Sequence, residues 1–149
     1  MNAPRLVVSD AEKLACFDVL HELRPSLKRE TFLDDLQRLG REGYALAAVW
    51  DGDVVRAVAG FRPMEMFSTG KILYVDDLVT AESHRSHGFG SELLRFLEAH
   101  AATLGCKYLE LDSGVKRLAA HRFYRREGLE EVALHFSIPL GDTKKWKEL

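Results

Sequence analysis

The sequence has little cysteine, no large excess of charge and no long apolar run. Its two cysteines, Cys16 and Cys106, fit neither a metal-binding nor a disulfide spacing, so we expect no bound metal and a reducing compartment. The net charge of -2 gives no field that would attract nucleic acid or a membrane. No stretch reaches membrane-spanning length, and the start, Met1-Asn2-Ala3-Pro4-Arg5, lacks a signal-peptide pattern. We therefore expect a cytoplasmic protein with neither a nucleic-acid nor a membrane partner.

A glycine-bearing segment, Arg85-Ser86-His87-Gly88-Phe89-Gly90-Ser91, lies between a strand-like run and an amphipathic helix that begins near Phe89. It is not a dinucleotide fingerprint, because Leu93 stands where a third small residue is needed, and no Gly-Lys-Ser/Thr of a P-loop is present. The amides from His87 to Ser91 are predicted to be free donors of the first helical turn. With Arg85 at the lip, we interpret the segment as a pyrophosphate cradle. A glycine-bearing turn with a solvated arginine is the alternative.

The rest of the chain predicts one α/β domain, residues 1–149, with a mixed sheet and the element order β-α-α-β-β-β-α-β-α-β. Asp10 is expected to cap the first helix, Pro25 to stop it, and the pair Asp51-Gly52 to form a hairpin turn. A loop is expected from Pro63 to Gly70. The predicted strands follow the hydrophobic periodicity and lie at 5–9, 44–50, 54–61, 72–80, 107–112 and 131–139. The predicted helices lie between Asp10 and Pro25, from Phe32 to around Gly40 or Gly43, from Phe89 to Leu104 and at 118–127.

Two motifs resemble those of the GCN5-related N-acetyltransferase (GNAT) family. Leu78-Val79-Thr80 followed by Arg85-Ser86-His87-Gly88-Phe89-Gly90 resembles the family's strand and R/Q-x-x-G-x-G/A loop. The stretch from Ala120 to Leu129 resembles its second signature, A-x-x-F-Y-x-x-x-G-F. The likeness covers nearly the whole chain, and residues 120–136 are loosely similar to the aminoalkylphosphonate-acetyltransferase branch. One departure is Arg117, which stands where the family usually has an asparagine that touches the cofactor.

The resemblance implies a single-domain GNAT fold with a mostly antiparallel sheet flanked by about four helices. It further implies an acyltransferase of the EC 2.3.1 class that moves an acetyl group from acetyl-CoA to a primary amine of a small molecule by direct attack. The residues that the resemblance assigns to acetyl-CoA binding are Leu78, Val79, Thr80, Arg85, Ser86, His87, Gly88, Phe89, Gly90, Ser91 and Arg117.

Acetyl transfer needs a base for the ammonium, a donor for the oxyanion and an acid for the leaving thiolate. The resemblance assigns the acid to Tyr124, whose alternative role is helix packing. It assigns the base to Asp76 and the oxyanion donor to a backbone N–H near Leu78. Alternation places Asp76 and Asp77 on opposite faces unless a bulge intervenes, and the alternative for either carboxylate is an arginine or backbone contact.

The acceptor site is expected at the first two helices and their junction, around His21, Glu22, Arg24 and Leu27, and at residues 63–68. Glu110 and Asp112 extend an acidic wall toward a cationic acceptor, or are simply solvated. The alternative functions are a catalytically silent CoA-binding module and a protein or peptide N-acetyltransferase. Edge strands of this fold commonly pair between subunits, so the resemblance also allows a homodimer.

Overall fold

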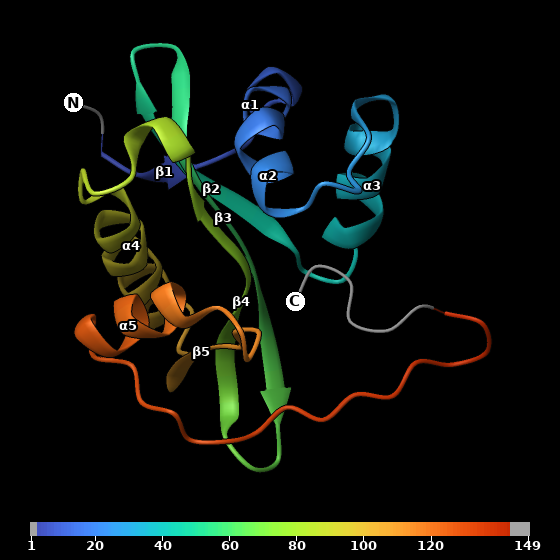
Figure 1. Cartoon of the computed structure of the whole chain (residues 1–149), viewed down its shortest axis with the longest axis vertical. Coiled ribbons are helices and arrows are strands. Elements are labelled where there is room, and N and C mark those ends of the chain that lie inside the picture. Colours follow the sequence, from blue (N-terminus) through green and yellow to red (C-terminus); the bar gives the residue numbers. More distant parts are fainter. Residues whose placement is uncertain (1–2, 144–149) are drawn as a thin grey trace. The chain divides into compact units, whose positions relative to one another are not determined.

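A five-stranded sheet with the order β1-β2-β3-β4-β5 organises the first 111 residues (Figure 1). All neighbouring pairs are antiparallel except β4 and β5, which run parallel. The computed structural model describes residues 3–143, which divide into two compact units at Leu111 and Asp112. The mixed sheet confirms the predicted fold class, whereas a single domain over 1–149 stays a prediction. The strands are β1 Arg5–Leu6, β2 Ala45–Asp51, β3 Val54–Met66, β4 Gly70–Thr80 and β5 Tyr108–Leu111.

Helices cover both faces of this sheet (Figure 1). On one face, the helices α1 (Asp10–Ala15), α2 (Phe17–Leu23) and α3 (Phe32–Gly40) enclose a core with Phe32 at its centre. On the other face, α4 (Phe89–Thr103) buries Phe89, Leu93 and Leu97 against β2, β3 and β4. Two 3-10 turns, η1 (Arg29–Thr31) and η2 (Glu82–His84), complete this unit. None of the helices between residues 3 and 143 is long and apolar enough to cross a membrane.

The local signals explain most helix boundaries. Ser9, rather than the expected Asp10, caps α1, because its hydroxyl accepts from the Glu12 amide while the Glu12 carboxylate accepts from the Ser9 amide. The first predicted helix is interrupted at Cys16, and α2 ends at Leu23, just before the Arg24-Pro25 pair. Asp51 and Val54 close the predicted hairpin around Gly52 and Asp53.

A register shift in the β3–β4 ladder decides how the two aspartates are presented. Gly60 pairs with Asp77, but the next residue, Phe61, pairs with Val75, so Asp76 has no partner across the ladder. Such a bulge shifts the alternation of side chains between the two faces of the strand by one residue. Asp76 and Asp77 therefore point to the same face of β4, the face covered by α2 and α3.

The expected loop from Pro63 to Gly70 was wrong, because β3 continues through Pro63 to Met66 and β4 already begins at Gly70. The pairing of β2 with β3 stops at Phe61, so among the strands of residues 3–143 the later part of β3 pairs with β4 alone. A proline, which lacks an N–H, is tolerated in a strand with such a free edge. The proposed acceptor segment 63–68 is thus mostly strand and hairpin tip.

The second unit, from Asp112 onward, contains α5 (Leu118–Arg126), which Gly128 ends with a φ of 96°. The predicted last strand at 131–139 is wrong, because these residues form neither helix nor strand. Their alternating apolar side chains, including Val132 and Phe136, are 78% to 85% exposed. Alternation makes a strand only where a neighbouring strand supplies backbone partners, and none of the described strands pairs with this segment.

Candidate active site

The loop before α4 has the backbone conformation of an anion-binding nest. Ser86 and Gly88 both have positive φ values, 70° and 81°, and Gly88 is the N-cap of the helix. Within residues 3–143, no atom accepts a hydrogen bond from the amides between Ser86 and Ser91. A β-carbon built on Gly88 would meet no atom within 4 Å, so the space beside it is open. Unpaired amides at a helix N-terminus favour a bound anion.

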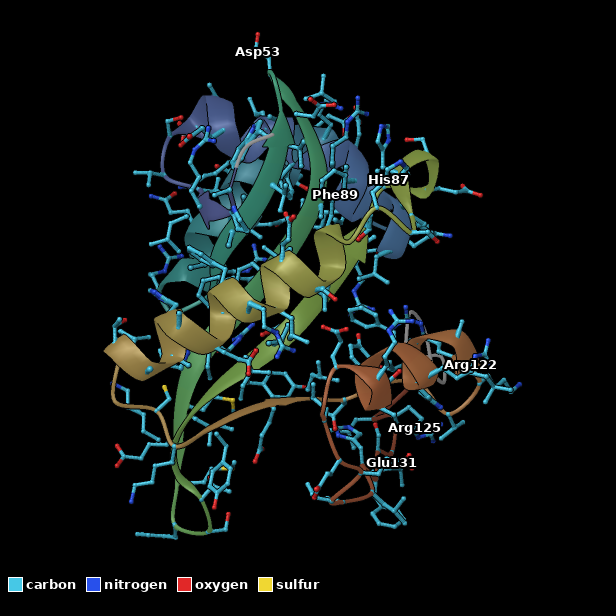
Figure 2. All side chains as sticks on the ribbon, turned by 90° about the vertical axis from the view of Figure 1, so that its left-hand side faces the viewer. Asp53, His87, Phe89, Arg122, Arg125 and Glu131 are labelled. Carbon is cyan, nitrogen blue, oxygen red and sulfur yellow. The ribbon has the colours of Figure 1, made fainter. Side chains whose placement is uncertain are left out.

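The side chains around the loop do not bond to its free amides. Figure 2 shows His87 and Phe89 at the start of α4. The Nδ1 of His87 lies 2.9 Å from the His84 carbonyl oxygen, and a carbonyl only accepts, so this nitrogen carries the proton. Arg85 is exposed and forms no ion pair with any residue of the described part of the chain. Arg85 is therefore the available cation beside the free amides.

Strand β4 has an open edge next to this loop. Its parallel ladder with β5 runs from Ile72 to Val75 and stops there, while its ladder with β3 continues to Thr80. From Asp76 to Thr80, β4 is thus paired on one side only. An extended ligand with amide groups can pair with such an edge as an additional strand does. The predicted cofactor residues Leu78, Val79 and Thr80 lie in this stretch.

Asp76, the predicted base, is bound to an arginine that sequence reasoning missed. The Nη2 of Arg62 lies 2.7 Å from Oδ2 of Asp76, and its Nε lies 3.1 and 3.2 Å from the two oxygens. Burial raises the pKa of the Asp76 carboxyl, and the Arg62 guanidinium offsets part of that rise. The same contact raises the pKa of Arg62. Asp76 is therefore a half-buried carboxylate whose charge is balanced by one neighbour.

Asp77 has both of its oxygens occupied. The Nε of Arg24 donates to Oδ1 at 2.7 Å, and the hydroxyl of Tyr44 donates to Oδ2 at 2.6 Å. Burial and then the Asp77 charge raise the pKa of Tyr44 well above its usual range, so its hydroxyl stays protonated. Opposite Asp77 on β3, Gly60 makes room for this contact, because a β-carbon there would lie 1.9 Å from the Tyr44 oxygen.

The C-terminal end of α2 contacts both the bulge in β4 and the turn η2 that leads to the glycine loop. The Nη2 of Arg24 donates to the carbonyl oxygen of Asp76 at 3.0 Å. The side chain of Glu22 accepts from the Glu82 amide at 2.9 Å, at the start of the turn that leads to the loop. Two of the residues expected near the acceptor therefore tie α2 to β4 and to η2. Asp76 and Asp77 are each paired with an arginine, so they do not form an uncompensated acidic wall.

The second unit holds the other predicted site residues. Tyr124 lies on α5, half-buried, with its ring 5.5 Å from that of Phe123 in an edge-to-face arrangement. Arg117 is the N-cap residue of that helix. His121 donates through Nε2 to the Gly114 carbonyl at 2.8 Å, which is a structural use of the ring. The Oδ2 atom of Asp112 lies 3.4 Å from Nδ1 of His135.

Figure 2 also shows Arg122 and Arg125 on α5, and Arg125 pairs with Glu131. All of these contacts lie within the second unit. They order α5 and the turn that follows it.

Three residues of the site escaped sequence reasoning: Tyr44, Gly60 and Arg62. One signal was present, since a glycine inside a strand marks a bulge or a close approach of another group. Arg62 and Tyr44 gave no such signal, because their partners are far away in the sequence.

Comparison with known proteins identifies the class. Residues 12–129 match the family model described as the acetyltransferase (GNAT) family. An uncharacterized N-acetyltransferase of Bacillus subtilis, YhdJ, is 34% identical over 79% of this chain and 84% of its own. The aminoalkylphosphonate N-acetyltransferase of Salmonella typhimurium is 31% identical over 62% of this chain and 60% of its own.

Solved structures share the fold at low identity. An aminoglycoside N-acetyltransferase, AAC(6')-Iy, solved in complex with CoA, has a TM-score of 0.81 at 13% identity, covering 95% of this chain and 97% of its own. A GNAT family acetyltransferase of Staphylococcus aureus has a TM-score of 0.78 at 21% identity, covering 94% of this chain and 100% of its own. The chain belongs to the GNAT family of acetyltransferases. It is an enzyme of the N-acetyltransferase class, which confirms the predicted family and enzyme class.

Proposed function

We propose that this protein transfers the acetyl group of acetyl-CoA to the primary amine of a small molecule. The observation that carries the proposal is the row of unpaired amides from Ser86 to Ser91 at the start of α4, beside an open strand edge. Membership in the GNAT family supplies the reaction class. A structural neighbour with the same fold was solved with CoA, which supports CoA as the carrier.

Acetyl-CoA would be held along the free edge of β4 and at the loop. The diphosphate would accept from the amides between Ser86 and Ser91, and Arg85 would add its charge. The extended arm of the donor would pair with the backbone between Asp76 and Thr80, where β5 leaves the edge open. Arg117 would replace the family's asparagine as a further donor to the cofactor.

The chemistry then needs two proton transfers, and we assign each to one side chain. Asp76 takes a proton from the acceptor ammonium, and the neutral nitrogen attacks the thioester carbon. A backbone N–H near Leu78 stabilises the oxyanion. The carbon–sulfur bond then breaks, and Tyr124 gives its proton to the departing thiolate. A phenol has a pKa of about 10 and a leaving thiol has a pKa of about 8.5, and these values are close enough for the proton transfer.

The Arg62 contact is compatible with this role for Asp76. Each carboxylate oxygen has about two lone-pair sites, and the arginine approaches Asp76 from one side. Burial, which raises the pKa of the Asp76 carboxyl, makes it a better proton acceptor than an exposed aspartate. The Arg62 guanidinium offsets part of this rise by favouring the ionised form.

The acceptor class rests on a sequence relative. The Salmonella typhimurium enzyme named for aminoalkylphosphonates is 31% identical over the matched residues, and an aminoalkylphosphonate is a small primary amine. We therefore place this class first in a test of acceptors. The experiment is release of the CoA thiol from acetyl-CoA with 2-aminoethylphosphonate, spermidine, an aminoglycoside, free amino acids and a short peptide.

Each result of this screen has a distinct meaning. Turnover with one of the small amines supports the proposal, and turnover with the peptide alone identifies a peptide N-acetyltransferase. Tight binding of acetyl-CoA without turnover on any acceptor identifies a silent CoA-binding module.

The binding site itself is tested by Gly88→Val, with Gly105→Val as a matched control. Both glycines have a positive φ at an end of α4, and neither has an atom within 4 Å of an added β-carbon. Both variants thus carry a similar backbone strain, but only Gly88 lies in the cradle. We expect calorimetry to show at least tenfold weaker acetyl-CoA binding for Gly88→Val alone. Equal affinities for the two variants would place the diphosphate elsewhere.

A further inference from the structure

The carbonyl group of Asp76 belongs to the bulged residue of β4. Gly60 faces Asp77 and Phe61 faces Val75, so Asp76 has no residue opposite it in β3. The Nη2 of Arg24 donates to this carbonyl oxygen at 3.0 Å. A single side chain at the C-terminal end of α2 thus contacts the backbone of the proposed base.

Arg24 is itself held in place by Asp77. Its Nε bonds Oδ1 of Asp77 at 2.7 Å, and Tyr44 bonds Oδ2 of the same carboxylate at 2.6 Å. The Asp77 side chain is 12% exposed and the Arg24 side chain 25% exposed. A partly buried carboxylate with a donor on each oxygen is held in one orientation, and it holds the guanidinium in turn.

We propose that Arg24, Tyr44 and Asp77 are positioning residues that fix the bulged Asp76 peptide in the orientation needed for proton removal. This proposal rests on the proposed function, because it assumes that Asp76 is the base. Asp77 takes no proton in this scheme; its carboxylate holds the Arg24 guanidinium and the Tyr44 hydroxyl. The two adjacent carboxylates therefore have different roles: Asp76 takes the proton, and Asp77 holds Arg24 in position.

The physical reason is the freedom of a bulge. A residue without a ladder partner is not restrained by its neighbouring strand, and a change of one register position would turn its side chain to the opposite face. The opposite face of β4 holds the apolar cluster of Val75, Leu73 and Phe89. Arg24 prevents this change through two nitrogens that bond two different acceptors. A lysine at position 24 has one nitrogen on a flexible stem and cannot reproduce that fork.

Other charged groups near Asp76 do not substitute for this restraint. Arg62 from β3 holds the Asp76 side chain but not its backbone. The charge of Glu42 acts on Arg62, and that of Asp77 acts on Asp76. Among these side chains of the described residues, Arg24 is the one that donates to the Asp76 carbonyl oxygen.

The first test needs no acceptor and no turnover. Backbone hydrogen exchange of a peptide that covers residues 74–80 is measured by mass spectrometry in the wild type, Arg24→Gln and Tyr44→Phe. The control is Arg38→Gln, which removes another ion pair, between Arg38 and Asp35, from the surface of α3. We expect exchange at least tenfold faster in Arg24→Gln, an intermediate effect in Tyr44→Phe and no change in the control. Unchanged exchange in Arg24→Gln would overturn the proposal.

The second test is kinetic and uses 2-aminoethylphosphonate or whichever small amine the screen identifies. Arg24→Gln should lower kcat roughly ten- to hundredfold, the cost of a small misplacement of a reacting group. The KM for acetyl-CoA should stay within twofold. In an Asp76→Asn background, where the base is absent, Arg24→Gln should have almost no further effect. Arg24→Lys should not restore kcat.

Three outcomes separate the possible failures. An equal loss of kcat in both backgrounds would mean that Arg24 acts only through stability, which the thermal midpoints would also show, and would overturn the proposal. Unchanged kcat in Arg24→Gln would overturn it as well. A wild-type protein that acetylates nothing would overturn the proposed function, while the exchange measurement would still decide whether Arg24 holds the bulge.

Discussion

Replacing Gly60 with alanine should destabilise the protein strongly, because the space above this residue is already occupied. The added β-carbon would lie 1.9 Å from the Tyr44 oxygen, 2.4 Å from its Cζ atom and 2.8 Å from Oδ2 of Asp77. Contacts of this length do not occur, so either the strand or the tyrosine must move. The Tyr44 ring is 8% exposed and packs in the core under α2 and α3, so it has little room to withdraw.

The magnitude follows from the two interactions that the methyl group disturbs. Loss of a hydrogen bond to a charged group costs about 1.5–3 kcal/mol. Overpacking of a well-packed core costs about 1–3 kcal/mol. Together they predict a loss of roughly 2.5–6 kcal/mol in the free energy of unfolding. For a chain of this size that corresponds to a fall in Tm of roughly 5–24 °C.

Urea denaturation measures this loss, with Gly40→Ala as the control. Gly40 lies at the end of α3, and an added β-carbon there meets no atom within 4 Å. We expect that variant to be unchanged or more stable by about 0.5–1 kcal/mol, since alanine restricts the unfolded chain. A Gly60→Ala protein as stable as Gly40→Ala would refute the packing argument. In a Tyr44→Leu background, which lacks the two Tyr44 atoms but keeps Oδ2 of Asp77, Gly60→Ala should cost less than it does in the wild type.

Three further measurements test the site and the core. Tyr124→Phe should lower kcat by about 10²-fold or more, as expected for loss of a general acid, with an unchanged KM for acetyl-CoA; full activity would exclude this tyrosine as the acid. Activity should fall as the pH drops through the raised pKa of Asp76, and Arg62→Gln, which removes the contact that lowers this pKa, should move that acidic limb to higher pH. Of the two thiols, only the partly exposed Cys106 should react quickly with Ellman's reagent in the native protein. Cys16 is buried, and burial raises its pKa to about 12, so two fast thiols would contradict the described core.

Features encoded by neighbouring residues could be predicted from the sequence. The stripe of Phe89, Leu93 and Leu97 repeats with helical spacing, and α4 begins at Phe89 as expected. The pair Asp51-Gly52 specifies a tight hairpin, and β2 and β3 pair around it. The glycine loop could be located for the same reason, because the residues that bend it and the helix that follows it are contiguous.

Features that depend on distant partners could not be predicted. The alternation of Val132, Leu134, Phe136 and Ile138 resembles a strand, but no described strand supplies its backbone partners. Pro63 looked like a strand terminator, yet β3 has a free edge at that point and continues through it.

The placement of the two aspartates is a further case of this kind. Strict alternation separates Asp76 from Asp77, and only the register of β3 against β4 reveals the bulge that brings them together. Arg62 and Tyr44 then come from segments that the sequence does not connect with either carboxylate.

The network around the bulge constrains what the site can accept. Two carboxylates and two guanidinium groups neutralise each other there, and the Tyr44 phenol stays protonated because of its raised pKa. The two aspartates thus offer a proposed acceptor ammonium no uncompensated pair of charges, because each is paired with an arginine. In the proposed mechanism the proton of this ammonium would pass to an oxygen that Arg62 already contacts, so the arginine and the ammonium would compete for one carboxylate. When the proton moves to Asp76 in this mechanism, the carboxyl becomes neutral and loses its charge interaction with Arg62. Because Arg62 stabilises the ionised carboxylate, it opposes this transfer and favours the return of Asp76 to its ionised form once the nitrogen has attacked the thioester, provided that the Asp76 backbone stays fixed while its side chain changes partners.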